Sequence, residues 1–377
     1  MMVTRKMKNL GIDLSLLGFG CMRFPMNEGK IDELVATNMI KEAMAKGVNY
    51  IDTAYPYHNG ASEPFVGRVL NEYERSSYYL ATKLPVWLVN SVEDAKRLFE
   101  EQLERLDKTY IDFYLLHALN KGTWQKVLDY GIIEYCEQLQ REGKIKYLGF
   151  SFHDDYEVFE EIATYRQWDF CQIQLNYMDT EEQAGEKGYA LTEQLGIPLV
   201  IMEPIKGGSL ANFSDDINAR FTAMDETASI SSFALRWVAS HPNVKVILSG
   251  MSTPEQVADN LNTFCNYKPM TEKEKEAINE IVGILRSRVQ NGCTGCRYCM
   301  PCPAGVDIPF NFKLWNTYHI YRNYWAVNWD WERNLGKAKA DACIKCGKCE
   351  QHCPQKIAIR KDLEQVMIDL ENPKWKP

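Results

Sequence analysis

Short apolar segments alternate with amphipathic stretches between about residue 12 and residue 265. Segments of this length, bounded by turn residues, are typical of buried strands, and apolar residues at helical spacing lie between them. The expected strands are Leu14–Gly20, Tyr50–Asp52, Tyr78–Lys83, Ile111–His117, Ile145–Ser151, Phe170–Gln174, Pro198–Met202 and Val244–Ser249. The expected helices are Ile31–Lys46, Val92–Leu106, Trp124–Arg141, Glu182–Leu195, Ala228–Ala239 and Glu255–Phe264, with weaker ones at Glu63–Asn71 and Asp155–Ala163. This alternation predicts a parallel sheet.

Two helix ends carry recognisable signals. Ser91 can cap the helix that follows it, and Gly196 stands where a helix should stop. An open, doubly wound sheet is the rival architecture, but no G-x-G-x-x-G motif follows the first strand. Eight βα units within about 250 residues favour a closed (β/α)₈ TIM barrel, an α/β fold.

Cysteine content divides the chain of 377 residues near position 290. Twelve cysteines are present, and eight of them fall between Cys293 and Cys353. A dense cluster of thiols in a reducing compartment points to metal binding more than to disulfides. We therefore expect a barrel domain over residues 1–290 and a small, mainly helical, ferredoxin-like iron–sulfur domain over residues 291–377.

Charge and hydropathy exclude several classes of partner. The formal net charge is −8, which disfavours a general nucleic-acid or anionic-membrane surface. No apolar run approaches the roughly 18 residues that a bilayer span needs. The cations near the start are not followed by an apolar segment of the secretory type. We expect a cytoplasmic protein that binds neither nucleic acid nor membrane.

Polar residues stand at the ends of three consecutive strands, where barrel enzymes place their chemistry. Asp52, Lys83 and His117 end these strands, and Tyr57 follows in the first loop. Each alone has a structural explanation, such as a helix cap or a satisfied buried histidine. Together they suit carbonyl reduction: an ammonium beside a phenol should lower the pKa of the phenol, a carboxylate holds the ammonium, and an imidazole orients the substrate oxygen.

These residues make the body resemble the aldo-keto reductase family. Gly47 to Ala54, then Tyr57 and Glu63 to Gly67, look like the family signature, and Lys83 and His117 complete its tetrad. The resemblance implies that Tyr57 is the general acid, that Lys83 and Asp52 tune it, and that His117 orients a small carbonyl substrate.

The resemblance also implies a site for a nicotinamide cofactor. Ser151 and Gln172 would hold the carboxamide, Met202 takes the place where many members stack an aromatic ring, and Lys206 and Gly208 would line the pyrophosphate. The segment with Gly250, Ser252, Gln256 and Asn260 resembles the loop that holds the adenosine phosphate. Members that prefer NADP place Lys and Arg where this chain has Gly250 and Gln256, so use of NADH, or weak dinucleotide binding, stays open alongside NADPH.

The tail contains two cysteine runs with iron–sulfur spacing. Cys343, Cys346, Cys349 and Cys353-Pro354 have the spacing of bacterial ferredoxins, and Cys293, Cys296, Cys299 and Cys302-Pro303 differ by one residue. We expect two [4Fe–4S] clusters with crossed ligation: Cys293, Cys296, Cys299 and Cys353 for one, and Cys343, Cys346, Cys349 and Cys302 for the other. Structural zinc is the alternative.

The whole chain resembles a subgroup of aldo-keto reductase-like bacterial proteins with a C-terminal ferredoxin-type domain. Nicotinamide passes two electrons as hydride and a cubane passes one, so coupling them calls for a converter such as flavin, for which we find no motif. Three functions remain: an NAD(P)H-dependent carbonyl reductase whose clusters relay electrons or brace the fold, a reductase driven by ferredoxin or another carrier, and a redox-sensing barrel without catalysis. The sequence does not identify the substrate.

Overall fold

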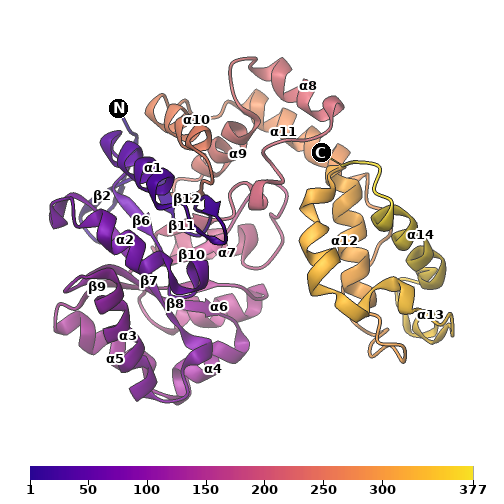
Figure 1. Ribbon diagram of the computed structural model, residues 1–377, viewed down its shortest axis with the longest axis horizontal. Helices are drawn as coiled ribbons and strands as arrows, with labels where there is room; N and C mark the ends of the chain where they lie inside the picture. The colour runs from indigo at the N-terminus through magenta and orange to yellow at the C-terminus, as the bar shows by residue number, and fades with distance from the viewer. Residues whose placement is uncertain (377) are drawn as a thin grey trace. The chain divides into compact units, whose positions relative to one another are not determined.

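The computed structural model describes residues 1–376 and contains a closed barrel of eight parallel strands (Figure 1). Neighbouring strands around the barrel are β3 (Leu17–Gly20), β6 (Tyr50–Asp52), β7 (Tyr79–Pro85), β8 (Ile111–Leu119), β9 (Ile145–Phe152), β10 (Phe170–Gln174), β11 (Leu199–Met202) and β12 (Val244–Gly250), which pairs with β3 again. The barrel expected from the alternating pattern is confirmed.

Helices lie between successive strands of this barrel, and one more, α10, follows the last strand. They are α1 (Glu33–Ala45), α2 (Ser62–Leu70), α3 (Val92–Leu106), α4 (Lys121–Asp129), α5 (Ile132–Arg141), α6 (Tyr156–Tyr165), α7 (Gly185–Leu195), α9 (Ile230–Ala239) and α10 (Pro254–Cys265). Ser91 accepts a hydrogen bond from the amide of Asp94 at the start of α3, and Gly196 ends α7 in the left-handed conformation, both as predicted. The single helix expected over Trp124–Arg141 is two helices, because Gly131 takes a left-handed conformation between them.

A hairpin precedes the barrel where the sequence suggested one long strand. β1 (Thr4–Met7) pairs antiparallel with β2 (Ile12–Ser15), so the segment expected as Leu14–Gly20 is divided between β2 and β3. Met7 and Leu14 are buried against barrel residues such as Tyr50 and Phe170, which lie at the beginnings of their strands. The hairpin therefore covers the end of the barrel opposite to the ends where the polar residues lie. A second, two-residue hairpin joins β4 (Met26–Asn27) and β5 (Lys30–Ile31).

Side chains from alternate strand positions fill the barrel interior. Tyr50, Phe113 and Phe170 belong to this packed interior, and Phe113 contacts both other rings edge-on. Glycines make room for them: a Cβ at Gly18 would lie 2.6 Å from Val246, and one at Gly149 would lie 2.6 Å from Phe170. The lower part of the barrel is thus a solid core, which leaves the carboxyl ends of the strands for chemistry.

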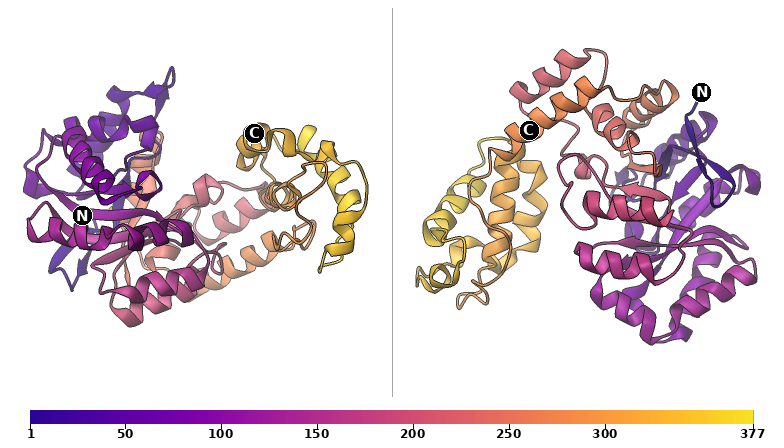
Figure 2. Two further views of the ribbon diagram at one scale, coloured as in Figure 1. Left: turned by 90° about the horizontal axis from the view of Figure 1, so that it is seen from below. Right: turned by 180° about the vertical axis from the view of Figure 1, so that it is seen from behind.

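The chain forms two compact units. The first consists of residues 1–207 and 231–271, and the second of residues 208–230 with the chain from Glu272 onward. The second unit contains α8 (Asp215–Met224), α11 (Glu272–Arg286), α12 (Ile308–Tyr321), α13 (Lys348–His352) and α14 (Ile359–Glu371). Arg288, just after α11, binds Asp216 of α8 at 2.7 Å, and α12 packs against α14 (Figure 2). The boundary expected at residue 290 thus lies inside this unit.

Aromatic side chains build much of the core of the second unit. Trp331, Tyr318 and Trp315 are buried together with aliphatic residues of α14. Trp315 donates a hydrogen bond to Asp369 and Trp331 donates one to Glu371, so each buried indole N–H has a partner. Within residues 1–376, every helix is too short or too polar to cross a membrane.

Candidate active site and cysteine hollows

Three strands place polar side chains at the barrel mouth, because every second residue of a strand faces the barrel interior. Tyr50, Ala81 and Leu115 point into the packed interior. Two residues further along the same three strands come Asp52, Lys83 and His117. Successive residues on a strand alternate between the two faces, so these side chains point inward again, one layer nearer the carboxyl ends. The sequence thus places three polar groups directly above an apolar layer.

Lys83 is the centre of the arrangement. Its ammonium donates hydrogen bonds to Asp52 Oδ1 at 2.6 Å, to the carbonyl of Thr53 at 2.8 Å and to the Tyr57 hydroxyl at 3.4 Å. The Lys83 side chain is 0% exposed and that of Asp52 is 3% exposed. The structure therefore brings Asp52, Tyr57 and Lys83 together as a buried chain of carboxylate, ammonium and phenol.

Burial and charge act in opposite directions on these groups. Burial lowers the pKa of Lys83, but Asp52 and Tyr57 more than offset this and leave it above its usual value. For Tyr57 burial dominates: the pKa of the phenol lies above 10, and Lys83 offsets the rise only in part. The lowered phenol pKa expected from the sequence is thus not found. A phenol that keeps its proton is nevertheless suited to donate it to a substrate oxygen.

His117 faces the same space as Tyr57. The two rings are edge-on with centroids 6.3 Å apart, and the Trp87 ring lies 5.2 Å from the imidazole on another side. Burial, and then the charge of Lys83, lower the pKa of His117 well below 6.5. The ring is therefore neutral at physiological pH and can donate one hydrogen bond to a substrate oxygen without adding charge.

A buried polar network behind strand β7 fixes the backbone of Lys83. Gln102 of α3 donates to the Lys83 carbonyl at 3.0 Å and to Glu63 of α2 at 2.8 Å. Thr82 also donates to Glu63, and Arg105 lies 3.5 Å from the second oxygen of that carboxylate. No local pattern in the sequence points to Gln102, because its partners are distant in the chain. The network joins both helices to the strand that presents the lysine.

Two predicted carboxamide ligands have polar atoms available at the mouth. Ser151 is the last residue but one of β9 and Gln172 lies in β10, and both are buried. Within residues 1–376, Ser151 Oγ and Gln172 Oε1 have no hydrogen-bond partner, while Gln172 Nε2 lies 3.6 Å from Met202 Sδ. Buried polar atoms are rarely left unpaired, so a hydroxyl and an amide oxygen in this position fit a ligand amide such as the nicotinamide carboxamide.

Lys206 is tied to a carboxylate. Its ammonium donates to both oxygens of Asp179 at 2.6 Å, and Gln174 and Asn176 also donate to the same carboxylate. Asp179 is buried, so its charge is matched by Lys206 within the protein. This pairing reduces the charge that Lys206 can offer to a pyrophosphate. Gly208, the neighbouring expected ligand, is the first residue of the second unit.

The segment predicted to hold the adenosine phosphate, residues 250–260, forms hydrogen bonds mainly within the protein. The amide of Ser252 donates to Gln256 Oε1 at 2.7 Å, and Ser252 Oγ donates to the carbonyl of Arg23 at 2.8 Å. Asn260 is buried and donates to Ser249 Oγ at 2.7 Å. Asn260 therefore braces α10 against β12, while Ser252 and Gln256 shape the loop.

Arg23 is a cation at this mouth that the sequence analysis did not single out. A Cβ on Gly250 would lie 3.2 Å from Arg23 Cγ, and one on Gly207 would lie 3.4 Å from Arg23 Nη2. The Arg23 side chain thus extends from Gly250 at the end of β12, where its aliphatic part lies, to Gly207 in the loop after β11, where its guanidinium lies. Its position directly after the first strand, next to Cys21, was the available signal. Cys21 itself is fully buried, and burial holds the pKa of its thiol well above 9, which leaves it unreactive.

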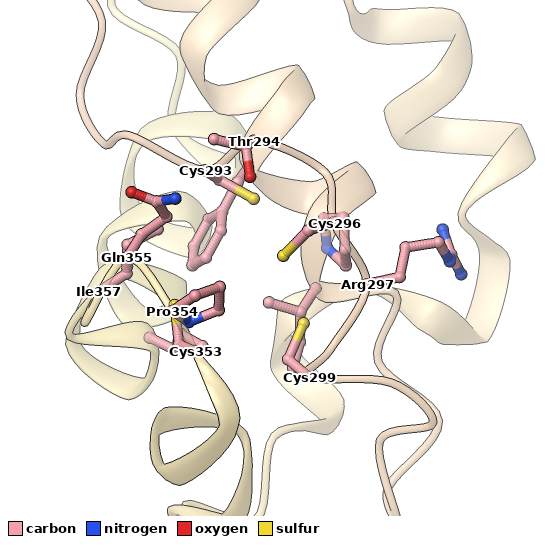
Figure 3. Close-up of a pocket in the computed structure, with 13 residues that line it drawn as sticks. Cys293, Thr294, Cys296, Arg297, Cys299, Cys353, Pro354, Gln355 and Ile357 are labelled. Atoms are coloured by element: carbon pink, nitrogen blue, oxygen red, sulfur yellow. The ribbon is translucent and has the colours of Figure 1, made fainter. Parts of the chain in front are cut away.

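The eight cysteines of the second unit line two separate hollows. Cys293, Cys296, Cys299 and Cys353 line the first, together with Phe312 and Pro309 (Figure 3). The other four line the second hollow; they are Cys302, Cys343, Cys346 and Cys349. Each set takes three thiols from one run and the fourth from the other run. This is the grouping that crossed ligation requires.

The two cysteine runs have matching backbone geometry. In the first run, the residues two and four places after Cys293, Gly295 and Arg297, have positive φ. The residues two and four places after Cys343, Lys345 and Gly347, have positive φ as well. These turns wrap each run around its hollow, and the shorter spacing before Cys302 does not remove that residue from the second hollow.

Comparisons with known proteins agree with both parts. The model of the aldo/keto reductase family matches residues 16–282, and that of the 4Fe-4S dicluster domain matches residues 292–358. The chain is 28% identical to the uncharacterized oxidoreductase YqkF of Bacillus subtilis, over 73% of this chain and 94% of that protein. It is also 28% identical to the NADH-specific methylglyoxal reductase of Escherichia coli, over 66% of this chain and 90% of that protein.

Solved structures give the same result for the barrel. The aldo-keto reductase AKR11C1 from Bacillus halodurans, in its holo form, superimposes with a TM-score of 0.62 at 26% identity, covering 74% of this chain and 96% of that one. The family match spans well over half of the chain. The chain is an oxidoreductase of the aldo/keto reductase family that carries a C-terminal 4Fe-4S dicluster domain.

Proposed function

We propose that this protein reduces a small carbonyl compound with a nicotinamide cofactor and that Tyr57 gives the proton. The observation that carries the proposal is the buried contact series from Asp52 through Lys83 to the Tyr57 hydroxyl. NADH or NADPH, when bound, supplies the hydride. Ser151 Oγ and Gln172 Oε1, which have no partner in residues 1–376, would hold its carboxamide.

Tyr57 and His117 act together on the substrate oxygen. A neutral His117 donates a hydrogen bond that orients the carbonyl, and the Tyr57 hydroxyl donates its proton as charge develops on oxygen. Lys83 then stabilises the phenolate that remains, and Asp52 keeps Lys83 charged. Tyr57→Phe removes only the proton donor, so turnover should fall by about 10²- to 10⁴-fold. Unchanged turnover in this variant would leave the redox-sensing barrel as the better reading.

The dependence on pH follows from the two shifted groups. Burial keeps Tyr57 protonated until the pH exceeds 10, and burial keeps His117 neutral until the pH falls below 6.5. Both groups are then in the active form throughout the interval between these values. We expect kcat for carbonyl reduction to be flat from pH 7 to pH 9; a bell-shaped profile within that interval would contradict the assignment.

We infer a preference for NADH over NADPH. A 2′-phosphate needs a charge-assisted partner, but Gln256 is neutral and Gly250 has no side chain. Lys206 is neutralised by Asp179, so Arg23 is the remaining cation for the pyrophosphate. Fluorescence titration of the full chain with each cofactor tests this. Tighter binding of NADPH than of NADH would refute it.

We further propose two [4Fe–4S] clusters, one in each cysteine hollow, which relay electrons or brace the fold. A reducing compartment, such as the cytoplasm, suits eight thiolates. Anaerobically purified protein should be brown and hold about eight irons per chain. Two zinc ions per chain and no visible absorption would instead support the structural alternative.

A second candidate is a reductase driven by an electron carrier such as ferredoxin. The neutralised Lys206 and the uncharged Gln256 favour it, because both reduce the attraction for a dinucleotide. A flavin would serve as the converter between one-electron and two-electron steps. Anaerobic reduction of the clusters by NADH, NADPH and reduced ferredoxin separates the candidates: reduction by ferredoxin alone would favour this one.

A further inference from the structure

The charge of the protein is distributed unevenly along the chain. Residues 1–290 have a formal net charge of −12, whereas residues 291–377 hold 13 Lys and Arg against 9 Asp and Glu, a net charge of +4. The cations gather near the cysteines: residues 343–361 contain five cations and a single carboxylate, Glu350. The overall negative charge therefore coexists with a basic segment at the second cysteine run.

Part of this segment lies in or next to the cysteine loop that lines the second hollow, and we call its exposed residues the Lys348 face. It consists of Ile344, Lys345, Lys348 and Arg360. Ile344 and Arg360 line the hollow directly, and the Arg360 guanidinium lies 3.5 Å from the place where a Cβ on Gly347 would be. All four residues of the face are exposed, as is the ligand candidate Cys346. The face thus reaches solvent at the cysteine loop itself.

The pairing of the cations leaves the face positive. Arg360 is bound to Glu350 at 2.8 Å and Lys345 to Glu364 at 2.5 Å. Lys348, in contrast, has no carboxylate partner in residues 1–376. Lys345 takes a left-handed conformation, which turns the chain around Cys346. The Lys345–Glu364 pair is largely exposed and therefore weak, so an incoming anion can compete for Lys345, whereas Arg360 is held by three hydrogen bonds to Glu350.

An apolar residue stands among these charges. Ile344 is 68% exposed, although it lies between two cysteines of the candidate ligand set. A small apolar centre with a charged rim is the usual anatomy of a protein–protein contact. Contacts between redox partners are small and depend on charge complementarity for their rate of association.

We propose that the Lys348 face is the docking site of an acidic protein that carries single electrons. The proposal rests on the cluster assigned above to the second hollow. In the complex, one electron passes from the reduced carrier to this cluster; the carrier is oxidised by one electron, the cluster is reduced by one, and no proton moves. Two such transfers supply the electrons for one two-electron reduction of the substrate.

The test uses the full chain with both clusters and reduced flavodoxin, an acidic one-electron carrier whose absorbance differs from that of iron–sulfur clusters. Stopped-flow absorbance measures the rate of cluster reduction at low and high salt. In Lys345→Glu/Lys348→Glu the rate at low salt should fall by about 10- to 100-fold, and the salt dependence should flatten, because steering by opposite charges is lost.

A matched control carries the same change of net charge elsewhere. Lys6→Glu/Lys8→Glu alters two exposed lysines at the N-terminal hairpin, and it should keep the wild-type rate with flavodoxin. Equal rates in the wild type and the Lys345/Lys348 variant, or a rate in the wild type that does not depend on salt, would overturn the docking site. So would a wild-type chain that flavodoxin does not reduce.

Iron content and reduction by excess dithionite distinguish this failure from failure of the proposed function. Protein without iron would refute the clusters themselves. Protein with eight irons that dithionite reduces fully, but whose rate with flavodoxin is unaffected by the double substitution, would refute only the Lys348 face. If the double substitution abolished binding to anionic vesicles but left the rate of reduction by flavodoxin unchanged, the Lys348 face would be a membrane-binding surface. That outcome would also overturn the proposal.

Discussion

Removal of the buried ammonium tests the electrostatic core of the barrel most directly. Lys83→Met keeps the length of the side chain but takes away its charge, so the Asp52 carboxylate loses its 2.6 Å partner. Lys83 donates to Asp52 Oδ1, whereas the other oxygen, Oδ2, has no hydrogen-bond partner in residues 1–376, and the residue is almost inaccessible to water. The variant therefore leaves a carboxylate buried without compensation.

The expected magnitude follows from that burial. Breaking a buried ion pair on one side costs about 3–5 kcal/mol, because the remaining charge stays desolvated. Asp52→Asn should cost a similar amount, since it strands the ammonium of Lys83. The double variant Lys83→Met/Asp52→Asn removes both charges and should cost about 3 kcal/mol less than the sum of the single changes.

Amide hydrogen exchange in the full chain measures these losses of stability without assuming that both units unfold together. Peptides over β6 (Tyr50–Asp52) and β7 (Tyr79–Pro85) report the barrel alone. A loss of 3–5 kcal/mol speeds their exchange by roughly 10²- to 5 × 10³-fold, and the double variant should recover much of it. If Lys83→Met exchanged within threefold of the wild type, or if the single effects simply added, the buried pair would not hold the site as we argue.

Four further changes have defined outcomes. Gln256→Arg should tighten NADPH about tenfold in fluorescence titration and leave NADH unchanged, because it offers a charged partner only to the 2′-phosphate. Gly67→Ala should lower the melting temperature measured by calorimetry, since its Cβ would lie 2.3 Å from the Leu106 carbonyl oxygen, whereas Gly283→Ala meets nothing within 4 Å and should not. Cys346→Ser should halve the iron content by chemical assay; full iron would refute the ligand set. Gln172→Leu should raise KM for NADH about tenfold in steady-state kinetics.

The positions of the catalytic candidates could be predicted because they follow from strand periodicity alone. Asp52, Lys83 and His117 each lie at or near the carboxyl end of an apolar strand, and parallel strands in a barrel bring these ends together. Three cysteines of each set were predictable for a similar reason, since ligands at short spacing belong to one local turn, whereas the fourth comes from the other run and followed from the ferredoxin spacing. Local rules of this kind do not depend on which other segments pack nearby.

Other features depend on tertiary contacts that no local pattern encodes. Asp179 carries no motif, but the loop after β10 places it against Lys206 and neutralises a predicted cofactor ligand. The pKa of Tyr57 was expected to fall because of its neighbour Lys83, yet the depth of burial decides the direction. Leu14 has the character of a strand residue, and only the pairing with β1 shows that it belongs to a hairpin outside the barrel.

The barrel residues themselves show how the two electron sources can be separated. Tyr57 would protonate the substrate oxygen whichever donor supplies the electrons, so Tyr57→Phe slows both routes equally. Gln172 differs, because its amide oxygen, which has no partner in residues 1–376, is proposed to hold the carboxamide of the nicotinamide. Gln172→Leu should therefore weaken reduction with NADH while sparing reduction driven by a protein carrier. If both routes weakened together, Gln172 would contact the substrate, and the nicotinamide position would have to be assigned to other residues.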